Sequence, residues 1–204
     1  MALSSPRTAL LTAIAGFTEQ TFLLKSRQEL STQASGVVRG KDFGSALWLA
    51  SYSSGPIPND DAVAYEALLN SLDGVIEPFE LFDLRRPSPR VSGGASAGTL
   101  AVVNANNKAV TIGGLTTGQI LSAGDYISFT YASTSRALHQ IVETVVAGTQ
   151  CEVRPHIRPG FTIGVAVNVG AARGLFTLLP NSIDSRAMGG LHSVVSFQAI
   201  QYLA

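Results

Sequence analysis

The apolar residues of this chain recur mainly with a period of two, which indicates β-strands with one buried face. From Ile127 to Tyr131, every second side chain is large and apolar, and the residues between them are small and polar. The stretch from Ile163 to Val169 alternates in a similar way. Twenty glycines divide the chain into short segments. The sequence therefore predicts a mainly β protein built from many short strands.

The N-terminal part of the chain predicts two or three strands between residues 17 and 54. In the clearest of them, Trp48 and Tyr52 fall on one face, while Leu47 and Leu49 fall on the other. Because both faces carry large apolar groups, we expect this strand to be covered on both sides.

One segment follows a helical period instead. Tyr65, Leu68, Leu69 and Leu72 are spaced i, i+3, i+4 and i+7, which places them on one stripe of a helix. The residues at 58–61 supply a cap and two carboxylates, which suit the positive end of the helix dipole. Gly74 stands where a left-handed C-terminal cap is favoured. The pattern predicts a helix over residues 60–73.

A stretch rich in proline and glycine, from Arg85 to Gly94, predicts a linker between two parts of the chain. The short strands expected within residues 98–169 fit a small closed barrel of the oligonucleotide/oligosaccharide-binding (OB) type. Longer strands are expected again near the C-terminus. We therefore expect a split β-sandwich domain, formed by residues 1–88 and 171–204, that carries the helix. An OB-like barrel at residues 89–170 is inserted into it.

The net charge and the low charged fraction of the chain indicate which kinds of partner it can attract. Fourteen basic and fourteen acidic residues cancel, so we expect no specific binding of nucleic acid and no attraction to an anionic membrane. Only 14% of the residues are charged and the mean hydropathy is +0.25, which favours burial of surface between subunits or a surface rich in small polar residues. The apolar run from Ala9 to Ala15 is too short for a signal peptide, and a short helix or strand is expected there.

Patterns that carry chemistry are missing from the sequence. His139, His156 and His192 have no second ligand at metal-binding spacing, and no nucleophile motif surrounds the single cysteine, Cys151. The three Gly-Gly pairs precede no phosphate-binding lysine and predict turns. Most carboxylates lie beside turns, strand edges or the helix start. We expect no enzyme, no catalytic residue, no metal and no cofactor.

A basic and aromatic set in the predicted barrel could in principle bind a single nucleic-acid strand by stacking. Phe129 and Tyr131 share the apolar face of Ile127, so packing in a core is the favoured use of these rings. The set comprises Lys108, Arg136, Arg154, Arg158, Tyr126, Phe129, Tyr131 and Phe161.

Three consecutive motifs carry a family resemblance. The segment from Leu121 to Phe129 contains an Ala-Gly-Asp turn that enters a strand, and it is followed by the segments 136–142 and 151–158. This series resembles the inserted barrel of the distal tail proteins of long-tailed bacteriophages. Other segments resemble the first domain of that family, which is interrupted by the barrel and continues after it. These segments are Trp48, the predicted helix with Gly74, and the stretch that begins at Gly174. The similarity spans most of residues 27–204.

The resemblance implies a structural role in a virion. Members of that family form a ring, usually a hexamer, at the tip end of the tail tube. One face of the ring binds the tube protein, and the other carries the hub, fibre and receptor-binding proteins of the baseplate. Assembly in the host cytoplasm would place the protein at the virion tail tip, without a cofactor. The alternatives are a carbohydrate-binding module for host attachment, and a different tail tube or hub subunit.

Overall fold

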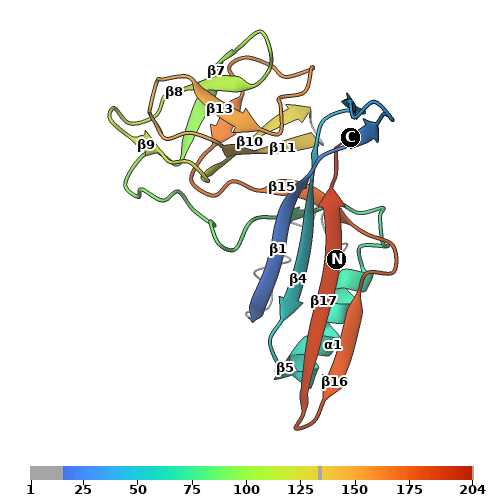
Figure 1. Cartoon of the computed structure of the whole chain (residues 1–204). Helices are drawn as coiled ribbons and strands as arrows, with labels where there is room; N and C mark the ends of the chain where they lie inside the picture. The colour runs from blue at the N-terminus through green and yellow to red at the C-terminus, as the bar shows by residue number, and fades with distance from the viewer. Residues whose placement is uncertain (1–15, 133–134, 204) are drawn as a thin grey trace.

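The computed structural model describes residues 16–132 and 135–203, which form a long sheet with a barrel at one end (Figure 1). Strands dominate, and the described residues contain a single helix. One set of strands closes into a barrel, and the others form separate sheets. The predicted class, mainly β with a sandwich-like part, one helix and a small barrel, is confirmed. None of the described helical residues forms a segment long and apolar enough to cross a membrane.

The long sheet is built from the two ends of the chain. Ala50 in β4 lies opposite Ala199 in β17, so the segments before and after the barrel pair directly. The sheet has seven strands, with β16 and β5 beside β17 and the others in the order β1-β4-β17-β15-β6. Their bounds are β1 Phe17–Lys25, β4 Leu47–Ser54, β5 Ile57–Pro58, β6 Phe79–Leu81, β15 Gly174–Leu178, β16 Asp184–Met188 and β17 His192–Gln201.

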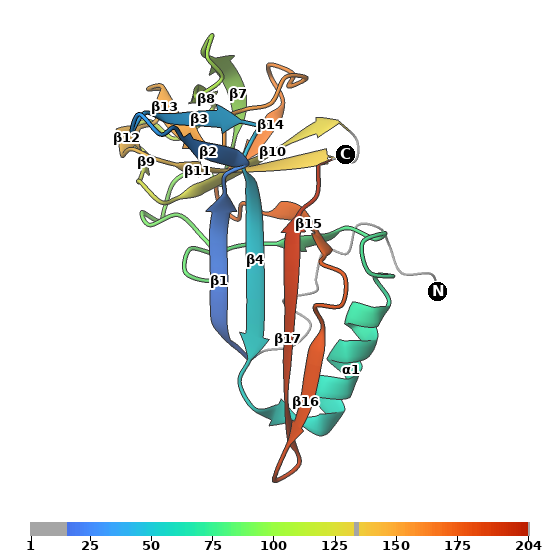
Figure 2. The same cartoon turned by 45° about the vertical axis from the view of Figure 1, so that its right-hand side comes forward.

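Strand β4 shows how the period-two pattern works in this sheet. Trp48, Ala50 and Tyr52 are buried on one face, as the alternation predicts. Leu47 and Leu49 on the other face are only half-buried, so the expectation that this strand is covered on both sides is wrong. The helix covers one face of the sheet, which leaves the opposite face more open (Figure 2).

Helix α1 runs over Asn59–Asn70 and ends three residues earlier than predicted. Tyr65, Leu69 and Leu72 are buried, so the predicted stripe does face the sheet. Asp73 and Gly74 both have positive φ angles, 48° and 68°, and this left-handed turn ends the helical conformation. The N-cap residue is Pro58, and no side chain caps the helix.

The barrel closes with six strands. Gly124 has a φ angle of 88° and makes the turn that enters β10, and Tyr126 in that strand lies opposite Gln140 in β11. The turn expected from the Ala-Gly-Asp motif is therefore present. The barrel order is β10-β11-β13-β8-β7-β14, with bounds Tyr126–Ala132, Ser135–Ile141, Cys151–Arg154, Ala109–Gly113, Ala97–Val103 and Ala166–Asn168.

Several short elements complete the fold. Strand β11 ends at Ile141, and Val145–Val146 forms a separate strand, β12, that pairs with β9 (Ile120–Leu121). Strand β6 has only three residues. Between β1 and β4 the chain forms an additional hairpin, β2 (Gln28–Thr32) with β3 (Val38–Asp42). The helix or strand expected at 9–15 lies outside the described residues.

The barrel is joined to the sheet through the indole of Trp48. Its Nε1–H donates a hydrogen bond to the Leu138 carbonyl oxygen in β11 at 2.9 Å. The indole also stacks on Phe22 at 5.1 Å between ring centroids and meets the Tyr126 ring edge-on at 5.6 Å. Leu138 and Tyr126 thus belong to the hydrophobic core of the sheet although they lie on barrel strands. The domain boundaries proposed at 88/89 and 170/171, between the split β domain and the barrel, remain a prediction that each part folds on its own.

Buried charges surround this junction. Asp83 accepts hydrogen bonds from the Tyr126 hydroxyl at 2.9 Å and from Arg85 Nη2 at 2.7 Å. Burial alone would raise the pKa of Asp83, but the hydrogen bonds from Arg85 and Tyr126 outweigh it and lower that pKa. Asp125 forms an ion pair with Arg86 on the linker. These contacts fix the linker and the barrel against the end of the sheet.

We expect Asp83→Asn to lower the free energy of unfolding by about 1–3 kcal/mol at pH 7, because charge-assisted hydrogen bonds to a buried group are lost. The pKa of Asp83 is lowered on folding. The stabilisation by ionised Asp83 is therefore complete above the pKa of this residue in the unfolded chain, about 4. It is lost as the pH falls through the pKa of Asp83 in the folded protein. Urea unfolding followed by Trp48 fluorescence should show the gap between variant and parent narrowing below about pH 4.

Asp184→Asn provides the control, since Asp184 pairs with Arg186 on the exposed strand β16. Its effect should stay within about 0.5 kcal/mol. A gap between Asp83→Asn and the parent that is the same at pH 3 and pH 7 would contradict the ionic role of Asp83.

Candidate functional site

The three histidines lie apart and none is arranged for metal binding. His139 is buried in the barrel, where its Nδ1–H donates to the Pro155 carbonyl oxygen at 2.8 Å and its ring stacks on Phe129. Burial lowers the pKa of His139 to about 4, so the ring is neutral at physiological pH. His156 lies at the barrel rim, and His192 lies beside the β16–β17 turn. No group of three or more potential metal ligands occurs among the residues that the structure describes.

Cys151 faces the barrel core and is fully buried. Burial and the nearby carboxylate of Glu143 raise the pKa of its thiol to about 11. A thiol in this setting is a poor nucleophile, because the reactive form is the thiolate. The residue packs as a small apolar side chain, as the sequence suggested.

The basic and aromatic set of the barrel does not form a stacking surface. Phe129 is buried in the barrel core, and Tyr131 and Phe161 pack against that core. Tyr126 is buried in the sheet core, and Arg136 and Arg154 form ion pairs with Glu80 and Glu152. Core packing, the use favoured from sequence, is therefore confirmed for these rings.

Sequence reasoning missed the buried carboxylates of the junction. Glu80, Asp83 and Asp125 are each less than a tenth exposed, and each has an arginine partner. The linker arginines Arg85 and Arg86 are the partners of Asp83 and Asp125, and Arg136 on β11 is the partner of Glu80. Their partners lie up to 56 residues away along the chain, so the pairing follows from the fold. Each carboxylate has a structural partner, and this arrangement stabilises the junction.

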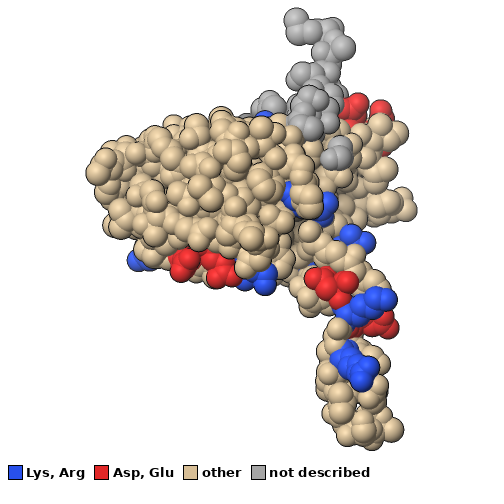
Figure 3. Space-filling model, turned by 90° about the horizontal axis from the view of Figure 1, so that it is seen from above, with Lys and Arg blue, Asp and Glu red and all other residues tan. Residues whose placement is uncertain are grey.

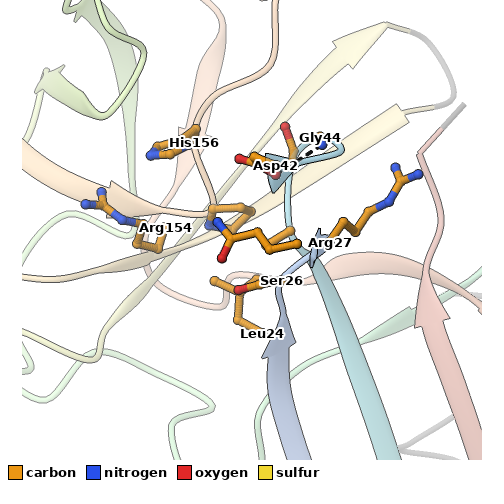
Figure 4. Close-up of a pocket in the computed structure, with 11 residues that line it drawn as sticks. Leu24, Ser26, Arg27, Asp42, Gly44, Arg154 and His156 are labelled. Carbon is orange, nitrogen blue, oxygen red and sulfur yellow. Dashed lines mark hydrogen bonds between the residues drawn. The ribbon is translucent and has the colours of Figure 1, made fainter. Parts of the chain in front are cut away.

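A crevice of 160 Å³ lies between the hairpin base and the barrel (Figure 4). Asp42 borders it from the hairpin side and His156 from the barrel side, while the guanidinium groups of Arg27 and Arg154 point to opposite sides. Burial lowers the pKa of His156, and the charges of Arg154 and Lys108 add to this effect. Because the cations diverge, the crevice does not present a convergent set of groups to a ligand.

The hairpin formed by β2 and β3 leaves the body as a narrow arm (Figure 3). Every residue of both strands is exposed, although an isolated two-stranded hairpin is only marginally stable in water. Thr32 lies opposite Val38 and Leu30 opposite Gly40, so Leu30 and Val38 share one face. Leu30 is 72% exposed. This apolar face has no partner among the described residues.

The long sheet has an edge on each side within the described part of the chain. Strand β1, which pairs only with β4, forms one edge; β16, which pairs only with β17, and the short β6, which pairs only with β15, form the other. Open edges of this kind are templates for pairing with another chain. Exposed apolar side chains lie near the β16 edge and on α1, namely Val63, Met188 and Leu191.

The features that stand out are thus the edges of the sheet and the exposed hairpin. No protein-family model matches the chain, and a search of curated proteins gives no match either. The site is therefore defined by geometry alone: two open sheet edges and a projecting hairpin.

The native thiol of Cys151 should react with a disulfide reagent such as Ellman's reagent at least about a hundredfold more slowly than in denaturant, because it is buried and protonated. Absorbance of the released thiolate at pH 8 measures both rates. A native rate close to the denatured rate would contradict the packing role and return Cys151 to the candidates for nucleophilic chemistry.

Proposed function

We propose that the chain is a structural subunit of a phage tail-tip ring, which joins the tail tube to the hub and the receptor-binding machinery. The observation that carries the proposal is the pair of open sheet edges, β1 on one side and β16 on the other. Different surfaces at opposite sides of one subunit favour head-to-tail contacts, and such contacts generate rings when the rotation between subunits closes. The resemblance of the barrel motifs to distal tail proteins supports the same role.

The composition agrees with large contacts between subunits. The charged fraction of 14% is well below the roughly 25% that is usual in globular domains. Apolar groups such as Leu30 and Leu191 are exposed on single copies and would be covered in an assembly. In this account the barrel is carried outward by the ring, and the protein reaches the virion tail tip after assembly in the host cytoplasm.

A carbohydrate-binding module has less support. Sugar-binding sites commonly use exposed aromatic rings, and Phe43 at the base of the hairpin is the sole exposed aromatic residue among those described. Retention on host polysaccharide, with no self-assembly, would favour that alternative. A tube subunit would instead stack into long tubes, whereas a tail-tip ring should cap the tube.

The purified protein should form a particle of about six times the 21.3 kDa chain mass, alone or when tail tube or hub protein is added. Native mass spectrometry measures this directly. Leu30→Asp should raise the concentration needed for assembly by about tenfold or more, because the charge would be buried in a contact. Val102→Asp, at an exposed apolar residue of the barrel, is the matched control and should assemble like the parent.

The proposal fails if the parent protein stays monomeric at all concentrations and with every tail partner. Gene order offers an independent check. A tape-measure gene upstream and hub or fibre genes downstream are expected, and a chromosomal setting without any tail genes would contradict the proposed role.

A further inference from the structure

The charges of this neutral chain are separated along the sequence. Residues 25–42, which include the hairpin, contain four basic and two acidic residues, a net charge of +2 (4 − 2). Residues 43–84, which include the helix, contain seven acidic residues and no lysine or arginine. The basic set is Lys25, Arg27, Arg39 and Lys41. The hairpin region therefore carries a net positive charge, and the helix region carries a net negative charge.

These charges are available for contact on the surface. Arg39 and Lys41 are exposed on the hairpin face opposite to Leu30, where Glu29 is the one acidic residue and lies opposite Lys41. Neither cation makes an ion pair within the described residues. Asp60 and Asp61 are exposed in the first turn of α1 and likewise form no ion pair in the described part of the chain. The two cations on the hairpin and the two carboxylates on the helix have opposite charges, so a hairpin and a helix that came close would attract each other.

The fold prevents this attraction within one copy. The hairpin leaves the molecule beside the barrel, at one end of the long sheet, and α1 packs along the sheet toward its other end (Figures 1 and 2). A hairpin can therefore reach a helix only on another copy, and that contact joins two different surfaces.

We propose that the basic face of the β2–β3 hairpin docks on the acidic outer surface of α1 in the neighbouring copy of this chain. The proposal rests on the ring proposed above and specifies the contact between neighbouring subunits of that ring. Complementary charges at such a contact speed association and fix its orientation, and they disfavour docking of hairpin on hairpin or helix on helix. The contact should weaken as salt is raised, since the charges are exposed in the single copy.

A charge-exchange experiment tests the contact. The hairpin variant is Arg39→Glu with Lys41→Glu, and the helix variant is Asp60→Lys with Asp61→Lys. Each variant alone carries like charges on both surfaces, so each should need at least about tenfold more protein to assemble than the parent. An equimolar mixture should recover assembly, because each reversed surface then meets its opposite. Native mass spectrometry of the mixture should find rings that contain the two variants in equal numbers.

Two exposed cations outside the hairpin strands provide the matched control. Lys108→Glu with Arg90→Glu changes the net charge by the same amount as the hairpin variant and should assemble like the parent. Recovery in the mixture also demonstrates that both variants are folded, and circular dichroism of each variant alone checks this independently.

The outcomes separate the two proposals. If the parent forms rings and both reversed variants do so at the same concentration, the hairpin–helix contact is wrong while the ring stands. Rings of the mixture with random composition would overturn the contact in the same way. If the parent itself never assembles, with or without tail proteins, the ring fails and the contact fails with it.

Discussion

The hydrogen bond from the Trp48 indole to the Leu138 carbonyl oxygen is the contact on which the arrangement of this molecule depends. It joins a sheet strand to a barrel strand 90 residues away along the chain. An indole N–H buried without a partner would cost about 1–3 kcal/mol, so the barrel strand must stay in place for the sheet core to be satisfied. Phe22 and Tyr126 complete the packing around the ring. Sheet and barrel therefore share one core at their junction.

This junction has consequences for the surfaces. With the barrel held at one end of the sheet, both outer strands β1 and β16 keep an open edge, and the hairpin base lies beside the barrel rim. The buried carboxylates form ion pairs with arginines at the junction. They are Glu80, Asp83 and Asp125. Exposed charges occur on the hairpin and the helix and also elsewhere on the surface. Those on the hairpin and the helix lie where the contact between copies is proposed.

The sequence was most informative where a local pattern decides the structure. The alternation around Phe129, the helical stripe of Tyr65 and Leu69, and the turn at Gly124 each depend on neighbouring residues, and each is present as predicted. Strand β16 was missed because all five of its residues are exposed, so no buried face produces an alternating pattern. The shared core at Trp48 was missed for another reason. It depends on contacts between distant segments, which composition and periodicity do not encode.

The candidate surfaces could not be predicted from the sequence. Whether Leu30 is buried or exposed, and whether Arg39 faces toward or away from it, depends on the hairpin register, which the sequence did not specify. The separation of charge between residues 25–42 and 43–84 is visible in the sequence. Its structural consequence depends on the fold, which places the hairpin beside the barrel and the helix toward the other end of the sheet.

The central claim is that this β scaffold acts through assembly, with the hairpin and the helix in contact between copies. Amide hydrogen exchange of the assembled and the dispersed protein, measured by mass spectrometry of peptides, tests that claim most directly. The account predicts that peptides covering the hairpin, residues 28–42, and helix α1 exchange more slowly in the assembly, while barrel peptides around β7 do not change. Equal exchange of the hairpin and helix peptides in both states would contradict it.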